Sequence, residues 1–106
     1  MADYVQVAKV ADVPPGRHCR VIVEGEGVLL ANLDGQYYAV ADTCTHEKAR
    51  LSEGFLVGSN IECPLHESRF DLKSGTVTSP PATAPLRAYE TKVEGDDVLI
   101  RISGQD

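Results

Sequence analysis

The chain has 106 residues, the length of one domain, and 42% of them are hydrophobic, which is enough to bury a core. The formal net charge of −6 argues against a nucleic-acid partner and favours docking to basic protein surfaces. No stretch approaches the roughly 18 apolar residues of a membrane-spanning helix. The first residues lack the basic region and apolar run of a secretory signal, so we expect a cytoplasmic protein without a membrane partner.

Strand and turn patterns dominate the first part of the chain. Strands are predicted at residues 4–8, 17–24, 27–33 and 36–40, with a turn segment at 10–16. Asp34-Gly35 joins the last two of these strands. This dipeptide predicts a tight hairpin, because a type I′ turn needs positive φ at both of its central positions.

The middle of the chain has a different pattern from the two ends. Within residues 43–81, short strands are predicted at 61–62, 69–71 and 76–77, and at most one helical turn fits, at 47–51. A second hairpin is predicted further on, between residues 87–93 and 98–102. These patterns indicate a small insert carried by an antiparallel base sheet.

Two short Cys/His pairs lie in this insert, Cys44-Thr45-His46 and Cys63-Pro64-Leu65-His66, with residues 47–62 between them. Each pair offers one thiolate and one imidazole. Two such pairs can hold a two-iron cluster asymmetrically, with both thiolates on one iron and both imidazoles on the other. An all-ferric [2Fe–2S] core carries two positive charges. Two thiolates bring its net charge to zero, whereas four thiolates would make it negative. An electron enters a neutral centre more easily, so this ligand set raises the reduction potential.

A structural zinc site is the alternative for the same four residues, although zinc sites usually keep two Cys together and then two His. The third cysteine, Cys19, has no cysteine left to pair with, so a reducing compartment fits. By strand alternation, Cys19 is predicted to be a small buried hydrophobe. His18 lies on the opposite face and is predicted to be an ordinary surface histidine.

These motifs, taken together over nearly the whole chain, resemble a Rieske-type ferredoxin. The resemblance also includes Leu51-Ser52-Glu53-Gly54, the run Glu67-Ser68-Arg69-Phe70-Asp71, Ser74-Gly75 and Pro80-Pro81. It implies an all-β single domain, with an antiparallel β-sandwich base at residues 1–42 and 82–106 and a cluster-binding subdomain at 43–81. It further implies one [2Fe–2S] cluster, with Cys44 and Cys63 on the inner iron, His46 and His66 on the outer iron, and a proline-containing loop as cover.

Departures from the respiratory members of this family favour a low potential. Ala49 and Leu65 occupy the positions of the two extra cysteines that form a disulfide in those proteins. Phe70 replaces a tyrosine whose hydroxyl would hydrogen-bond to sulfur, whereas the corresponding serine, Ser68, is present. Losing a donor to sulfur lowers the potential. Glu67 replaces a frequent glycine, which makes the conformation of the second ligand loop an open question.

Within the family, the chain resembles the small members that lack a disulfide and a membrane anchor. These are similar to the ferredoxin components of bacterial aromatic-ring dioxygenase systems. The resemblance implies a one-electron carrier between a flavin-dependent NAD(P)H reductase and a terminal Rieske non-haem iron oxygenase. No substrate chemistry is expected, because His18 alone cannot complete a two-His-one-carboxylate iron site. The alternative within the family is a Rieske subunit of another redox enzyme, such as nitrite reductase.

Four glutamates lie near the predicted ligands in sequence: Glu47, Glu53, Glu62 and Glu67. We predict that some of them steer a basic partner toward the cluster. The alternative is that all four are solvated loop carboxylates.

Overall fold

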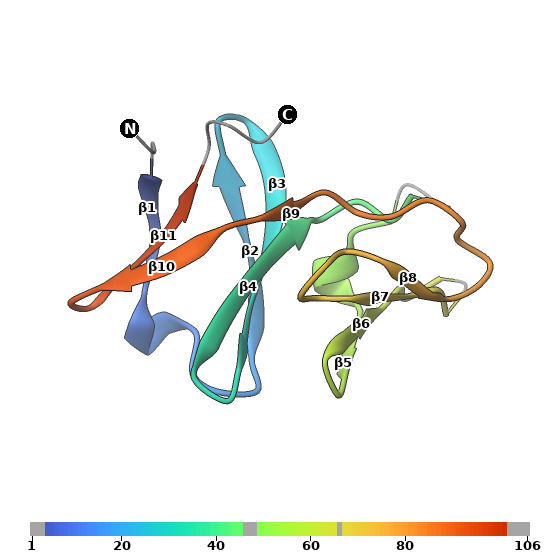
Figure 1. The fold of residues 1–106 in the computed structure, drawn as a ribbon, viewed down its shortest axis with the longest axis horizontal. Helices are drawn as coiled ribbons and strands as arrows, with labels where there is room; N and C mark the ends of the chain where they lie inside the picture. Colours follow the sequence, from blue (N-terminus) through green and yellow to red (C-terminus); the bar gives the residue numbers. More distant parts are fainter. Residues whose placement is uncertain (1–3, 46–48, 66, 102–106) are drawn as a thin grey trace.

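Three antiparallel sheets make up the computed structural model, which describes residues 4–45, 49–65 and 67–101 (Figure 1). The first sheet, in the order β1-β11-β10, contains β1 (Tyr4–Lys9), β10 (Thr91–Glu94) and β11 (Asp97–Arg101). The second, in the order β2-β3-β4-β9, contains β2 (His18–Val23), β3 (Glu26–Leu33), β4 (Gln36–Ala41) and β9 (Ala88–Tyr89). The third, in the order β5-β6-β7-β8, contains β5 (Phe55–Val57), β6 (Asn60–Glu62), β7 (Arg69–Asp71) and β8 (Val77–Ser79). The predicted all-β fold is confirmed.

The second sheet is central, because its two faces contribute to different cores. Successive side chains of a strand point to opposite faces. Val28 and Leu30 of β3 pack with Val98 and Ile100 of β11, which forms the core of the base sandwich. Leu29 of β3, on the other face, packs with residues of the third sheet. The insert therefore has no core separate from the base.

The predicted hairpin at Asp34-Gly35 is confirmed. Leu33 of β3 pairs with Gln36 of β4, and the two turn residues have φ values of +55° and +93°. Positive φ at both positions is what a type I′ turn requires. The turn fixes the register of β3 and β4, and so decides which residues face each core.

The prediction of one continuous strand at residues 87–93 is wrong. The strand breaks at Glu90: β9 pairs with β4 in the second sheet, and β10 pairs with β11 in the first. The chain thus crosses from one layer of the sandwich to the other at this point. Glu90 stays on the outside, where its carbonyl accepts a hydrogen bond from the Arg101 N–H at 2.9 Å.

Helical structure in the described residues is limited to two short 3₁₀ turns. The first, η1 (Val10–Asp12), lies in the predicted turn segment. The second, η2 (Leu51–Glu53), lies beyond most of the predicted helical turn at 47–51, of which residues 47 and 48 are outside the described part of the chain. In the described ranges, no helix has the length and hydropathy needed to cross a membrane.

The short strands of the insert follow the predicted pattern with small shifts. The strand at residues 69–71 is confirmed as β7, the strand at 61–62 begins one residue earlier as β6, and β8 begins at Val77. β5 has only three residues and was not predicted from the sequence. β5 is an edge strand, and its Phe55 is 61% exposed.

Candidate metal centre

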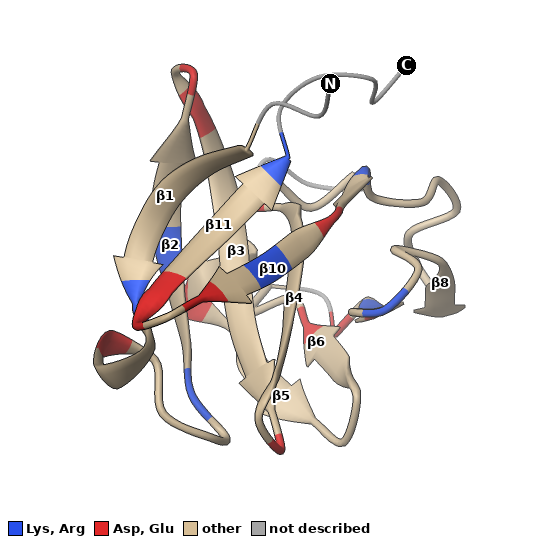
Figure 2. Cartoon of the chain, turned by 60° about the vertical axis from the view of Figure 1, so that its left-hand side comes forward, with Lys and Arg blue, Asp and Glu red and all other residues tan. Residues whose placement is uncertain are grey.

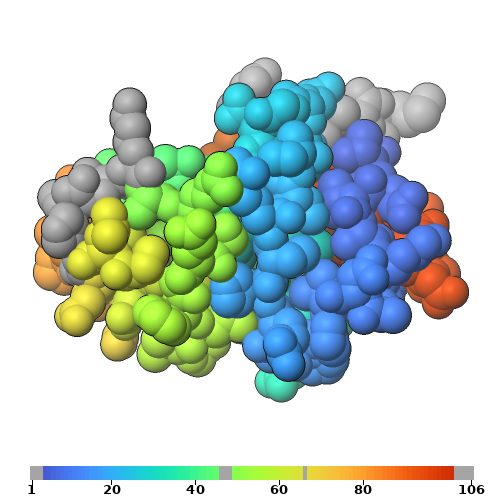
Figure 3. Space-filling model, turned by 180° about the vertical axis from the view of Figure 1, so that it is seen from behind, coloured from blue at the N-terminus to red at the C-terminus, as the bar shows by residue number. Residues whose placement is uncertain are grey.

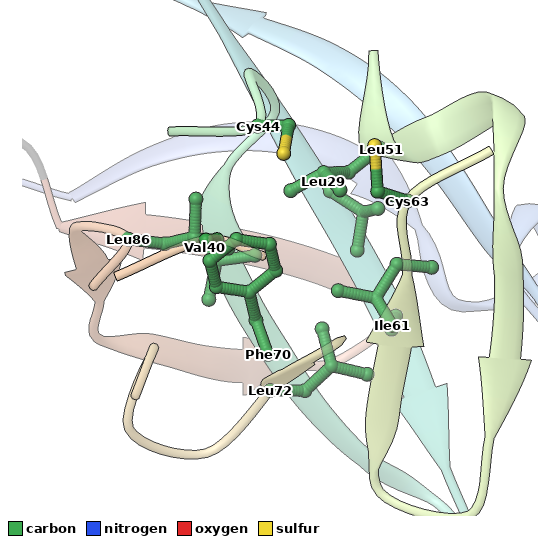
Figure 4. Packing of buried hydrophobic residues seen from close by; sticks show 11 residues of the cluster. Leu29, Val40, Cys44, Leu51, Ile61, Cys63, Phe70, Leu72 and Leu86 are labelled. Carbon is green, nitrogen blue, oxygen red and sulfur yellow. The ribbon is translucent and has the colours of Figure 1, made fainter. Parts of the chain in front are cut away.

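Cys44 and Cys63 are brought into one apolar cluster of side chains. They are 3% and 1% exposed, and both belong to the core that joins the second sheet to the insert. Figure 4 shows the two cysteines at one end of this cluster, with Leu72 at the other. The nineteen-residue separation in sequence is therefore closed by packing of the insert on the base. Soft thiolate ligands suit an iron–sulfur cluster, so the chemistry of these two donors fits that group.

Each cysteine begins a loop of the same length. The Cys44 N–H donates to the Ala49 carbonyl at 2.9 Å, and the Cys63 N–H donates to the Ser68 carbonyl at 2.8 Å. In both loops the acceptor lies five residues after the cysteine. His46 and His66, the other two predicted ligands, belong to these loops but lie outside the described residues.

The residues that flank the two loops are also paired in the same way. Thr43 forms an antiparallel bridge with Arg50, and Glu62 pairs with Arg69 between β6 and β7. Each pair closes the stem of a hairpin around one ligand loop. The backbone therefore presents the two Cys/His pairs on two hairpin loops of matching span.

A third segment, residues 80–86, is hydrogen-bonded to both ligand loops. The Thr45 hydroxyl donates to the Ala84 carbonyl at 2.6 Å, and the Ala82 N–H donates to the Ser68 hydroxyl at 3.0 Å. This is the segment that contains Pro80-Pro81. Ser68 is fully buried and accepts the Ala82 N–H through its oxygen, so its own hydroxyl hydrogen is available to another acceptor.

The residues that depart from the respiratory pattern differ in burial. Phe70 is 0% exposed and packs in the same core as the cysteines, with no hydroxyl to donate. Ala49 packs against this core, whereas Leu65 is 60% exposed. All three cysteines lie in the described part of the chain, and none of them forms a disulfide.

Glu67 answers the open question about the second loop. Its φ is +62°, so it adopts the left-handed conformation that glycine favours. The loop keeps this geometry although a glutamate occupies the position. Glu67 is exposed and follows the second Cys/His pair directly in sequence.

The predicted steering glutamates separate into two kinds. Glu62 forms an ion pair with Arg69, with Oε1 and Nε 2.9 Å apart, so its charge is already matched. Glu53 and Glu67 are exposed, and Glu47 is outside the described residues. Figure 2 shows that other acidic residues gather at the turns of the base, including the turn between β10 and β11.

Two residues near the site differ from what the sequence predicted. His18 is not an ordinary surface histidine: it is half-buried, and its Nε2 lies 2.9 Å from the carbonyl oxygen of Ser52. Asp42 was missed altogether, yet its carboxylate is buried and accepts hydrogen bonds from Ser52. These partners are ten or more residues apart, so no local pattern could have indicated them.

Cys19 lies away from this site. It is partly buried and packs against the core of the base sandwich, as the strand alternation predicted. Burial raises the pKa of the Cys19 thiol, with a smaller contribution from Asp12. Cys19 is therefore an apolar packing residue and lies in the other core from Cys44 and Cys63.

Comparison with known proteins gives consistent matches. Residues 3–90 match the family described as the Rieske [2Fe-2S] domain. The chain is 39% identical over 100 residues to the naphthalene 1,2-dioxygenase system ferredoxin component of Pseudomonas aeruginosa, covering 94% of this chain and 96% of the relative. It is 40% identical over 101 residues to the biphenyl dioxygenase ferredoxin subunit of Pseudomonas sp. strain KKS102, covering 94% and 93%.

Solved structures give the same match. One similar chain comes from a complex of reduced oxygenase and oxidized ferredoxin in carbazole 1,9a-dioxygenase, with a TM-score of 0.87, 37% identity and 92% of each chain covered. Another carries the description nitrite reductase NADPH (small subunit) oxidoreductase protein, with a TM-score of 0.80 and 29% identity over 92% of this chain and 97% of that one.

Proposed function

Because the chain belongs to the Rieske [2Fe-2S] domain family, we propose that it carries single electrons from a flavin-dependent NAD(P)H reductase to a terminal ring-hydroxylating oxygenase. Its cofactor is one [2Fe–2S] cluster, which accepts and releases one electron when bound. The observation that carries the proposal is the burial of Cys44 and Cys63 in one core, each at the start of a loop that also contains a histidine. Membership of the family sets aside the zinc alternative.

The proposed ligands are Cys44 and Cys63 for the inner iron and His46 and His66 for the outer iron. Matching loop spans and the burial of both thiols support this assignment. The proposed cluster-binding subdomain is residues 43–81, on a base of residues 1–42 and 82–106. The separate sheet of β5 to β8 supports these boundaries.

The residues around the loops fit a carrier better than an enzyme. Leu65 is 60% exposed beside the second pair, where it offers an apolar contact to a partner. Electron-transfer contacts are small and brief, so one such side chain and a few charges are enough. We assign the chain no substrate chemistry, because His18 is the one histidine outside the two Cys/His pairs and cannot by itself complete a two-His-one-carboxylate iron site. A cytoplasmic location fits these partners.

Stopped-flow mixing tests the proposal. The chain, purified with its cluster, is reduced anaerobically by NADH through the reductase of a naphthalene dioxygenase system and then mixed with the oxidised oxygenase. We expect the visible absorption to bleach in the first step and to recover in the second, with one electron per chain. A chain that purifies without iron and sulfide, or that the oxygenase does not reoxidise, would contradict the proposal.

Similarity to a nitrite reductase small subunit supports a second candidate function. In that case the chain passes its electron within a nitrite-reducing enzyme. A pull-down with the tagged chain from its own host separates the two functions, because the captured partner is a ring-hydroxylating oxygenase in one case and a nitrite reductase large subunit in the other.

A further inference from the structure

Asp42 lies just after β4 and two residues before Cys44, and its side chain is 2% exposed. Its Oδ1 accepts a hydrogen bond from the Ser52 N–H at 2.6 Å, and its Oδ2 accepts one from the Ser52 hydroxyl at 2.7 Å. The same Oδ2 lies 3.0 Å from Nε of Arg20. Both carboxylate oxygens are therefore occupied, one by a backbone donor and one by a hydroxyl and a guanidinium.

This network closes the stem of the Cys44 loop at both ends. The Leu51 N–H donates to the Asp42 carbonyl at 2.7 Å, and Nε2 of His18 contacts the Ser52 carbonyl at 2.9 Å. His18 and Arg20 belong to β2, whereas Ser52 belongs to η2. Figure 3 shows the green part of the insert lying directly alongside the blue strand β2. The start and end of the loop are consequently fastened to each other and to the base.

The path of the Arg20 side chain depends on a glycine. A Cβ atom at Gly27 would lie 2.4 Å from Nη2 of Arg20, so the absence of a side chain there leaves room for the guanidinium in its present position. Arg20 and Gly27 lie on neighbouring strands, β2 and β3. The guanidinium reaches the buried carboxylate in this way, and the Arg20 side chain as a whole is 34% exposed.

The charges of this pair lie close to the ligand loop. Two residues of extended chain span at most about 7 Å, so the Asp42 Cα lies within that distance of the Cys44 Cα. Because the Asp42 carboxylate is buried, its charge is screened less by water than an exposed charge would be, and it interacts more strongly with a nearby redox centre. An unmatched carboxylate would oppose the entry of an electron, and the Arg20 cation offsets that effect.

We propose that Arg20 and Asp42 form a charge-balanced clamp, which positions the Cys44 loop and sets the reduction potential of the cluster. The inference rests on the proposed function, because it assumes that Cys44 holds the cluster. Asp42 and Arg20 are positioning residues: Asp42 contacts Ser52 and Arg20 contacts Asp42, and they act on the centre through the loop stem and through their charge.

Redox titration of the cluster-loaded protein, followed by electron paramagnetic resonance, tests the clamp in three variants. Asp42→Asn keeps the shape and removes the negative charge, so we expect the equilibrium constant for reduction to rise about tenfold, which is about 59 mV for one electron. Arg20→Gln should lower the constant, by less, because Arg20 is partly exposed and screened by salt. The double variant should return close to the wild-type potential.

Two controls separate charge from geometry. Arg20→Lys keeps the charge and should keep the potential, whereas Ser52→Ala removes one hydrogen bond without changing any charge. Both controls should unfold more easily than the wild type, with potentials near the wild-type value. If Asp42→Asn does not retain a cluster, the contrast between Arg20→Gln and Arg20→Lys decides the question alone.

Opposite shifts in the two charge variants support the clamp. Shifts in the same direction, no shift in either, or an Arg20→Lys shift as large as that of Arg20→Gln would overturn it. A wild-type chain that holds no [2Fe–2S] cluster would overturn the proposed function and the clamp together. A normal wild-type spectrum with unmoved variants overturns the clamp only.

Discussion

The two ligand loops have the same backbone closure, but different side chains hold their stems. In both, the cysteine N–H donates to the carbonyl five residues later. The first stem is held by the buried carboxylate of Asp42, whereas the second is part of a sheet and carries the half-exposed pair of Glu62 and Arg69. Ladder hydrogen bonds hold the second loop, which joins two strands of one sheet. The first loop is flanked by a single bridge, and the buried Asp42 side chain adds hydrogen bonds to its stem.

Removal of the carboxylate from each stem should give the largest difference in stability between the two loops. Asp42→Ala leaves the Ser52 N–H and Arg20 without their acceptor, and breaking a buried pair costs about 3 kcal/mol. Glu62→Ala should cost less than about 1 kcal/mol, because its pair is largely screened and the sheet remains. Loss of the cluster's visible circular dichroism in a urea titration measures both. Equal costs for the two variants would contradict the contrast between the stems.

A methyl group at Gly54 should disturb the second stem through the backbone. The Cβ atom of Gly54→Ala would lie 2.0 Å from the Glu62 carbonyl oxygen, and the backbone there cannot move without displacing Cys63. We expect a cost of about 2 to 3 kcal/mol and a lower iron content. Gly58→Asn is the control, because that position is open and asparagine tolerates positive φ. Wild-type iron content in Gly54→Ala would show that the close approach is unimportant.

The hydrogen bonds from segment 80–86 to the two loops should differ in strength. Ser68→Ala leaves the buried Ala82 N–H without its acceptor, at a cost of about 2 kcal/mol. Thr45→Val removes the hydroxyl donor to Ala84 at an exposed position and should cost about 1 kcal/mol or less. Urea titrations of the two variants give the order. A larger loss in Thr45→Val would reverse our account of how the segment is held.

Glu67→Gly should have the smallest effect, and it should stabilise. Glycine removes the strain of a left-handed residue but adds freedom to the unfolded chain, so we expect a gain of up to about 1 kcal/mol. Glu67→Gln keeps the backbone strain and removes only the charge. If steering is real, both variants weaken the salt dependence of reduction by the reductase, whereas only the glycine variant is more stable. A loss of stability on Glu67→Gly would mean that the loop gains from the side chain.

The parts that could be predicted from the sequence are set by local rules. Asp34-Gly35 indicates a tight turn because both residues tolerate positive φ. The spacing of Cys44 and Cys63 from their histidines indicates the type of cluster before any fold is known. Strand alternation along β2 likewise predicts that Cys19 packs inward. Each of these signals lies within a few residues of the feature it determines.

The parts that were missed depend on partners distant in sequence. Ser52 of η2 is held by Asp42, ten residues earlier, and by His18, 34 residues earlier. The break at Glu90 exists because β9 and β10 belong to different sheets. These hydrogen-bond partners and strand ends depend on tertiary packing, which cannot be predicted from composition or periodicity.

Pulsed electron paramagnetic resonance of the reduced protein, labelled with ¹⁵N-histidine, tests most directly whether two histidines ligate one iron of the cluster. The chain has three histidines, and we propose that two of them, His46 and His66, bind one iron. This assignment predicts couplings from two histidine nitrogens, unchanged in the His18→Gln variant. One coupling, none, or a loss on changing His18 would contradict a cluster held by the two matching loops.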